Sequence, residues 1–238
     1  MEIKGNISSA TFIRRDNRFI ATVKIGHYLY SAHVPNTGRM RELLRLGREV
    51  MVVENIQPNR KTDYDLILVK IAGGWACIDS RIPNRLFSES FKDELFPYFQ
   101  GYQNLKAEVT YRNSRFDFCL SNPEKSQRRI LPAKYYLEVK SVTLVKNHQA
   151  AMFPDAPTER GTKHLEDLIM AREQGHGAGI LFCVQREDAD YFTPHDDNDP
   201  VFGDALRKAK AAGVDVMACL SIVDEREIYL SEPIPVVL

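Results

Sequence analysis

Residues 134–145 read KYYLEVKSVTLV, and the earlier residues 115–120 read RFDFCL. Both runs are rich in β-branched and aromatic residues, which predicts two strands. Residues two apart in a strand point to the same face, so Glu138 and Lys140 share one. If the two strands are neighbours, Asp117 and Glu138 can converge on one Mg²⁺ or Mn²⁺ ion, and Lys140 can reach a water beside it. We therefore predict Asp117, Glu138 and Lys140 as catalytic residues, with Asp117 and Glu138 as the metal ligands.

A second interpretation of the same residues is open. Glu138 and Lys140 can be two residues of a half-solvated strand that pair with each other or across the sheet. Their neighbours Leu137, Val139 and Val142 favour a strand covered on both faces, where an acid and an amine are costly without a function or close partners. The residues alone do not separate the two interpretations.

The order of elements predicts an α/β domain in the second part of the chain. Apolar spacing and turn signals predict helices at 84–99, 161–174 and 201–212, and strands at 105–111, 115–120, 134–145, 178–184, 214–223 and 226–230. A helix, three strands, a helix and a strand, with an acid on the second strand and Glu-x-Lys on the third, resemble the restriction-endonuclease-like, or PD-(D/E)xK, nuclease fold. Phe116 stands where that motif has proline.

The first part of the chain has an all-β pattern. Short strands are expected at 10–14, 18–25, 27–34, 49–55 and 66–71, with one short helix at 39–46. Five strands and a helix predict a small barrel of the OB type. We therefore expect an OB-fold-like barrel over residues 1–80 and a nuclease-like αβββαβ domain over residues 81–238.

Five stretches of the chain are similar to the sugar fermentation stimulation protein A family. They are HVPNTGRMRELL (33–44), RIPNRLF (81–87), SRFDFCL (114–120), YYLEVKSVTLV (135–145) and FPDAPTERGTKHLEDL (153–168). The resemblance implies an OB-fold joined to a nuclease-like domain, in a cytoplasmic prokaryotic protein that binds DNA without sequence preference. It also implies a regulatory link to sugar, chiefly maltose, metabolism, for which no residue here argues.

The formal net charge of zero conceals an asymmetry. Residues 1–80 carry 12 Lys and Arg against 8 Asp and Glu, whereas residues 81–238 carry 20 against 24. The basic half is the first candidate for contact with phosphates, although cations on a solvated strand face give the same count. Aromatic residues among the predicted strands, such as Phe12 and Tyr28, can stack on bases or fill the barrel core.

Basic residues also mark three places outside these strands. Arg39 follows the turn PNTG, Arg81 and Arg85 stand at the domain junction, and a basic turn begins the helix after the Glu-x-Lys strand. Each place also has an alternative interpretation. The turn PNTG can be a capped turn, the domain junction a simple linker with Asn84 as a cap, and the basic turn a solvated helix end. We expect single- or double-stranded DNA to contact Arg14, Arg15, Arg18, Arg39, Arg81, Arg85, Arg160, Lys163 and His164.

Several classes of protein are disfavoured by the sequence. No run approaches the roughly 18 apolar residues of a membrane span, and residues 1–5 (MEIKG) lack a signal-peptide core, so we expect a cytoplasmic protein without a membrane partner. The four cysteines form no Cys-x-x-Cys pair and are expected to be buried thiols. The open functions are a DNA-binding protein with a Mg²⁺-dependent phosphodiesterase centre, a DNA-binding regulator that does not cut, and an RNA-processing or repair nuclease. The oligomeric state stays open, a homodimer included.

Overall fold

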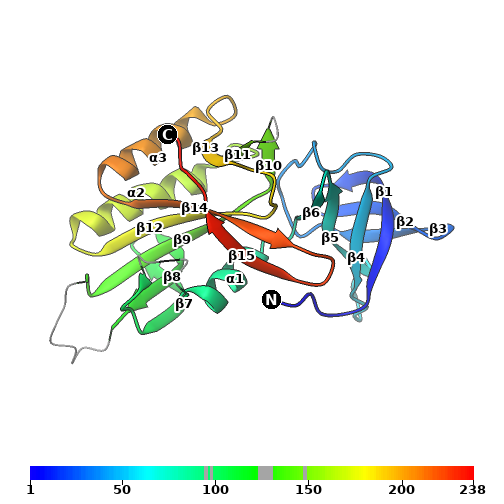
Figure 1. Ribbon diagram of the computed structural model, residues 1–238, viewed down its shortest axis with the longest axis horizontal. Coiled ribbons are helices and arrows are strands. Elements are labelled where there is room, and N and C mark those ends of the chain that lie inside the picture. Colours follow the sequence, from blue (N-terminus) through cyan, green and yellow to red (C-terminus); the bar gives the residue numbers. More distant parts are fainter. Residues whose placement is uncertain (94–95, 97–98, 123–130, 147–148) are drawn as a thin grey trace.

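A β-barrel and an α/β domain follow each other along the chain (Figure 1). The computed structural model describes residues 1–93, 96, 99–122, 131–146 and 149–238. The barrel contains β1 (Ile7–Asn17), β2 (Ile20–Ile25), β3 (Tyr28–His33), β4 (Glu49–Glu54), β5 (Tyr64–Ile71) and β6 (Gly74–Cys77).

The barrel closes through its third and fifth strands. The sheet has the order β3-β2-β1-β4-β5-β6, and a parallel pairing of β3 with β5 joins its ends. Phe12 fills the core, whereas Phe19 and Tyr28 are exposed. The predicted five-stranded OB barrel is confirmed, and β6, which follows a turn at Ala72 and Gly73, is an addition that the prediction lacked.

The helix expected at 39–46 does not form. Residues 41–43 and 46–47 make turns, and the amides of Leu43 and Leu44 both donate to the carbonyl of Met40. Met40 has a φ of 47°, and its amide donates to Asp155 of the other domain at 2.8 Å. This tertiary contact, together with full burial of the Met40 side chain, outweighs the local helix propensity.

A six-stranded sheet forms the centre of the C-terminal domain. Its strands are β7 (Asn104–Tyr111), β8 (Ser114–Ser121), β9 (Lys134–Val142), β12 (Gly177–Val184), β14 (Asp215–Val223) and β15 (Ile228–Pro233), in the order β15-β14-β12-β9-β8-β7. Helices α2 (Glu159–Glu173) and α3 (Pro200–Ala211) cover one face, and α1 (Ile82–Ser90) packs on the other (Figure 1). The predicted order of helix, three strands, helix and strand is confirmed. A small sheet of β10 (Leu144–Lys146), β11 (Ala150–Phe153) and β13 (Tyr191–Pro194) stands beside it.

Two predicted elements have different bounds in the structure. The helix expected at 84–99 ends at Ser90, and its positions 94–95 and 97–98 lie outside the described residues. Pro83 belongs to the first turn of α1, where a missing amide hydrogen costs nothing, so Asn84 lies inside the helix and does not cap it. The strand expected at 134–145 is two strands, β9 and β10, separated at Thr143.

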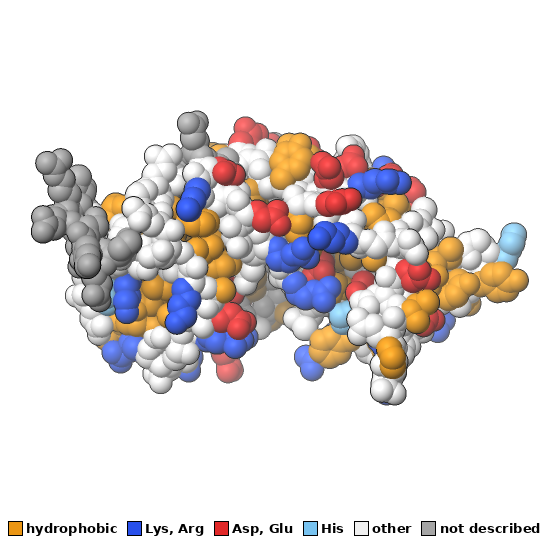
Figure 2. Space-filling model, turned by 90° about the horizontal axis from the view of Figure 1, so that it is seen from below, with side chains coloured by type: hydrophobic (Ala, Val, Ile, Leu, Met, Phe, Trp, Pro, Cys, Tyr) orange, Lys and Arg blue, Asp and Glu red, His pale blue; other side chains and the backbone are white. Residues whose placement is uncertain are grey.

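Charged groups of both signs are interspersed over the face that Figure 2 shows, with small hydrophobic areas between them. The charge asymmetry between the two halves of the chain is therefore not concentrated on this face. None of the described helices is long and apolar enough to cross a membrane.

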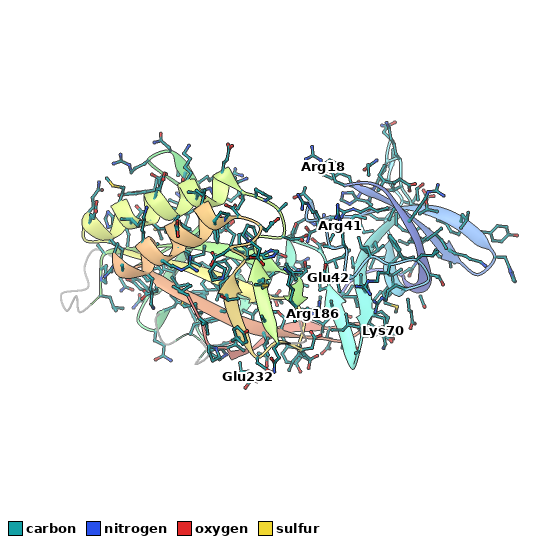
Figure 3. The ribbon with its side chains drawn as sticks, turned by 90° about the horizontal axis from the view of Figure 1, so that it is seen from above. Arg18, Arg41, Glu42, Lys70, Arg186 and Glu232 are labelled. Atoms are coloured by element: carbon teal, nitrogen blue, oxygen red, sulfur yellow. The ribbon has the colours of Figure 1, made fainter. Side chains whose placement is uncertain are left out.

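The two domains share one apolar core. Met51, Ile67 and Trp75 of the barrel belong to the same buried cluster as Phe87 of α1 and Leu181 of β12. Polar contacts add to this core, because the Gln185 side-chain amide donates to the carbonyl of Cys77 at 3.0 Å. Figure 3 shows Glu42 of the barrel near Arg186 of the C-terminal domain, whose positive charge acts on that carboxyl group. Because apolar burial of this kind would be lost on separation, the barrel and the α/β domain are fixed relative to each other.

Candidate active site

Asp117 lies where β8 separates from β9. The paired residues of these strands run from Phe118 opposite Leu137 to Ser121 opposite Lys134. Beyond Phe118, the Asp117 carboxylate takes the place of a backbone partner: its Oδ2 accepts the Val139 amide at 2.8 Å, and its Oδ1 accepts the Asn84 side-chain amide at 2.7 Å. The carboxylate is thus held from both β9 and α1.

Glu138 is held through one of its two oxygens. Its Oε1 accepts from Lys140 Nζ at 2.5 Å and contacts His164 Nδ1 at 2.6 Å. Its Oε2 is buried without a hydrogen-bond partner among the described residues, and the residue is only 3 % exposed. A buried carboxylate oxygen without a partner is costly, and it is the kind of atom that a cation would satisfy.

The two carboxylates have opposite pKa shifts. Burial, and then repulsion by Glu138, raise the pKa of Asp117 above its ordinary value, against the opposing effects of the Val139 amide and Asn84. Burial also acts to raise the pKa of Glu138, but Lys140 and His164 outweigh it and bring that pKa below its ordinary value. The pair therefore combines a readily ionised acid with one that resists ionisation while no further cation is present.

Both carboxylates line a cavity of about 460 Å³ between the two domains. Lys140 and Arg160 line it from the C-terminal domain, together with the loop 154–158. The barrel contributes the turn 36–38 as an opposite part of the wall. A phosphate group in this cavity would therefore meet residues of both domains.

The donor set fits a hard divalent cation. Among the described residues, no group of three or more His, Cys, Asp and Glu side chains is arranged to hold a metal, and the two carboxylates are the candidate side-chain ligands at this cavity. Mg²⁺ is commonly bound by one or two carboxylates with waters and substrate phosphates completing its shell. Asp117 and the free Oε2 of Glu138 match that pattern.

The three residues of the predicted basic turn of α2 lie in three different environments. Arg160 is exposed and lines the cavity, and its Nε lies 3.4 Å from Nε2 of His164. Lys163 is exposed on the helix and is not part of the cavity lining. His164 is 3 % exposed, so its ring contacts Glu138 and cannot reach a nucleic acid. We therefore correct its predicted role to that of a residue that positions Glu138.

Arg15 also differs from the prediction. Its guanidinium donates to the carbonyl oxygens of Arg18, Asn36, Gly38 and Arg39 at 2.6–2.9 Å. A side chain that makes four backbone hydrogen bonds holds the turn in place and has little capacity left for a phosphate. We correct its role from nucleic-acid contact to support of the turn.

Other predicted arginines are exposed but differ in their partners. Arg14 pairs with Asp16 at 2.7 Å, and Arg81 pairs with Asp79 at 2.6 Å. Arg85 lines a cavity to which Asp117 and Asn84 also contribute. Arg18 and Arg39 are exposed and form no ion pair with a described residue.

The turn 35–39 does not offer the phosphate site that a following helix would have created. Gly38 donates its amide to Asn36 Oδ1 at 2.8 Å, and Met40 donates its amide to Asp155. These amides are already satisfied. Sequence reasoning also missed the roles of Asn84 and Asp155, although both lie in the quoted stretches RIPNRLF and FPDAPTERGTKHLEDL.

Comparisons with known proteins place this geometry in a family. Residues 13–78 match the family model described as the SfsA N-terminal OB domain, and residues 81–227 match the sugar fermentation stimulation protein RE domain. A sugar fermentation stimulation protein homolog of Acetivibrio thermocellus is 46 % identical over 241 residues and covers 100 % of both chains. One from Clostridium botulinum is 47 % identical over 236 residues and covers 99 % of both. A solved structure, described as Pyrococcus furiosus SfsA in complex with Ca²⁺, has a TM-score of 0.88 at 28 % identity and covers 100 % of this chain and 98 % of that one.

Proposed function

Since the chain belongs to the sugar fermentation stimulation protein family, we propose that it binds DNA without sequence preference and hydrolyses phosphodiester bonds with a divalent cation at Asp117 and Glu138. The observation that carries this proposal is the buried, unpartnered Oε2 of Glu138 at a cavity that Asp117 and Lys140 also line. Two acids that could hold a divalent cation, with an amine beside them at an open cavity, suit metal-assisted phosphodiester hydrolysis.

The residues divide the chemistry among themselves. Asp117 and Glu138 would hold Mg²⁺ or Mn²⁺, which supplies charge neutralisation at the phosphate and a lowered pKa of water. Lys140 is tied to Oε1 of Glu138, so its ammonium is kept at the cavity, where it can orient the attacking water or stabilise charge that develops on the phosphate. Arg160, at the same cavity, can bind a phosphate oxygen.

The comparisons support the cation and the polymer in different ways. The description of the Pyrococcus furiosus structure names Ca²⁺, an ion that binds oxygen ligands. This supports a divalent cation here, while Mg²⁺ or Mn²⁺ is our inference from the small number of carboxylates. The OB barrel supports nucleic-acid binding, because such barrels hold strands by basic grooves and aromatic stacking.

A DNA-binding regulator that does not cut is the second candidate. It is favoured by Phe116, which stands in place of the motif's proline. The family-implied link to sugar, chiefly maltose, metabolism would follow from DNA binding alone. An RNA-processing or repair nuclease would use the same site on another polymer.

One experiment separates these candidates. Calorimetric titration with Mn²⁺ and Mg²⁺ is combined with incubation of the protein with single-stranded DNA, duplex DNA and RNA. We compare the wild type with Glu138→Gln and with the control Glu166→Gln, which changes an exposed acid on α2. The proposal is supported if the wild type and Glu166→Gln bind metal and cleave DNA, whereas Glu138→Gln does neither. Metal binding without cleavage of any polymer supports the regulator, cleavage of RNA alone supports the RNA nuclease, and a wild type that binds no metal refutes the site.

A further inference from the structure

A second cavity lies directly beside the first, on the barrel. It has a volume of about 350 Å³, and the described residues that line it include Arg18, Arg39 and Arg41 but no acidic side chain. Thr37 and Gly38 line both cavities. The catalytic cavity is therefore continuous with an arginine-rich surface, and the turn 37–38 is the ridge between them.

The three arginines have no acidic partner among the described residues. All three are exposed, and none forms an ion pair there. Figure 3 shows Arg18 and Arg41 together on the side of the barrel that faces the C-terminal domain. Like charges gathered without a counter-charge repel one another, so this surface favours a polyanion. Neighbouring Arg14, by contrast, already has Asp16.

The ridge between the cavities is rigid. Arg15 donates to the carbonyl oxygens of Asn36, Gly38 and Arg39, and the Asn36 side-chain amide donates to the carbonyl of Ile78 at 2.9 Å. From the other domain, Asp155 accepts the Met40 amide. A surface that is fixed before binding loses little conformational freedom on binding, which favours affinity.

We propose that one single strand of nucleic acid runs from the catalytic cavity over Thr37 and Gly38 and onto Arg18, Arg39 and Arg41, which bind its phosphates. This arginine track rests on the proposed function, because the strand it holds is the substrate of the Asp117–Glu138 site. The catalytic cavity, at about 460 Å³, falls in the range of pockets that hold a small-molecule-sized group, so it suits one unpaired nucleotide better than a duplex.

An exposed aromatic ring supports a single strand as the occupant. Phe19 is 44 % exposed, and the Arg18 guanidinium lies 4.9 Å from the centre of its ring. Unpaired bases stack on such rings, and stacking is tolerant of sequence. The bases of a duplex are already stacked on one another and cannot use it.

The test compares two variants that lose the same charge. Arg18, Arg39 and Arg41 are changed together to Gln, and the control changes Lys106, Lys208 and Lys210 together to Gln. The control residues are exposed on β7 and α3, which lie away from the barrel (Figure 1). Binding of single-stranded DNA, from a dinucleotide to about 16 nucleotides, is measured in EDTA at several salt concentrations. EDTA prevents hydrolysis, so the result does not depend on catalysis.

We expect the wild type to bind more tightly as the strand lengthens, and the Arg18, Arg39 and Arg41 variant to lose most of that gain. The slope of log affinity against log salt should fall by about 0.7 for each lost phosphate contact, or about 2 in all. The control should keep the wild-type slope. Three results would overturn the proposed arginine track. They are an unchanged slope in the arginine variant, an equal change of slope in the control, and tighter binding of duplex than of single strands.

Failure of the track and failure of the proposed function give different results. Mn²⁺ binding should be unchanged in the arginine variant, because these residues lie outside the carboxylate pair, and loss of Mn²⁺ binding in this variant would contradict the separation of track and site. A wild type that binds no Mn²⁺ would refute the site, while the length and salt dependence in EDTA would still show whether a strand follows the arginines.

Discussion

Asp117 and Glu138 line the same cavity, yet their removal should change the stability of the metal-free protein in opposite directions. Asp117→Asn removes a carboxylate whose pKa is raised by burial and by Glu138, so its ionised form is unfavourable at neutral pH. The new amide keeps both hydrogen bonds, since its oxygen can accept from Val139 and its nitrogen can donate to Asn84 once that side chain turns over. We expect a gain of about 0.5–2 kcal/mol in the free energy of unfolding.

Glu138→Gln should have the opposite effect. The pKa of Glu138 is lowered because Lys140 and His164 favour its charged form over the opposing effect of burial. The amide would leave the Lys140 ammonium, whose side chain is 14 % exposed, without the carboxylate that it contacts. Hydrogen bonds to charged groups contribute about 1.5–3 kcal/mol, so we expect a loss of that order. For a chain of this size the unfolding temperature would fall by roughly 3–12 °C.

Scanning calorimetry in EDTA measures both variants against pH. Because the pKa of Asp117 is raised in the folded protein, its ionisation lowers the free energy of unfolding by the full amount at any pH above that folded pKa. The stability gained by Asp117→Asn should therefore be full at neutral pH and fade as the pH falls through that pKa. The lowered pKa of Glu138 makes its contribution complete above the unfolded pKa, so the deficit in Glu138→Gln should disappear only as the pH falls through the lower, folded pKa. If both substitutions shift the unfolding temperature in the same direction at neutral pH, the reasoning about the two carboxylates is refuted.

Three further predictions follow from the same contacts. Lys140→Ala should still bind Mn²⁺ in a calorimetric titration but lose DNA cleavage, and retained cleavage would contradict its place in the chemistry. His164→Ala should weaken Mn²⁺ binding by roughly 10–100-fold, because residues that hydrogen-bond to a metal ligand orient it. His164→Asn, which keeps a donor near Glu138 Oε1, should recover part of that affinity, and equal affinities in both variants would exclude a positioning role for His164. The full chain should unfold in one calorimetric transition, since Trp75 of the barrel and Phe87 of α1 share a core, and two separated transitions would show independent domains.

The regular spacing of side chains along strands and helices was enough to predict much of the site. Glu138 and Lys140 share a face because the strand period is two, and their pairing in the structure follows from that spacing. Arg160 and His164 are four apart on α2, and the same helical spacing brings them together. The barrel and the order of the α/β elements were equally predictable, because local periodicity records which face of each element is buried.

Contacts between distant segments decided the rest. The Asp117 carboxylate accepts the Val139 amide because β8 and β9 separate at that point. The residue pattern of neither strand predicts where they separate. Met40 and Asp155 are 115 residues apart, yet their hydrogen bond accompanies the turn that replaces the expected helix. The sequence by itself determined which residues have the chemistry and which face of an element they occupy. Only the tertiary structure determined which are buried and which oxygen is left without a partner, because these depend on atoms from distant parts of the chain.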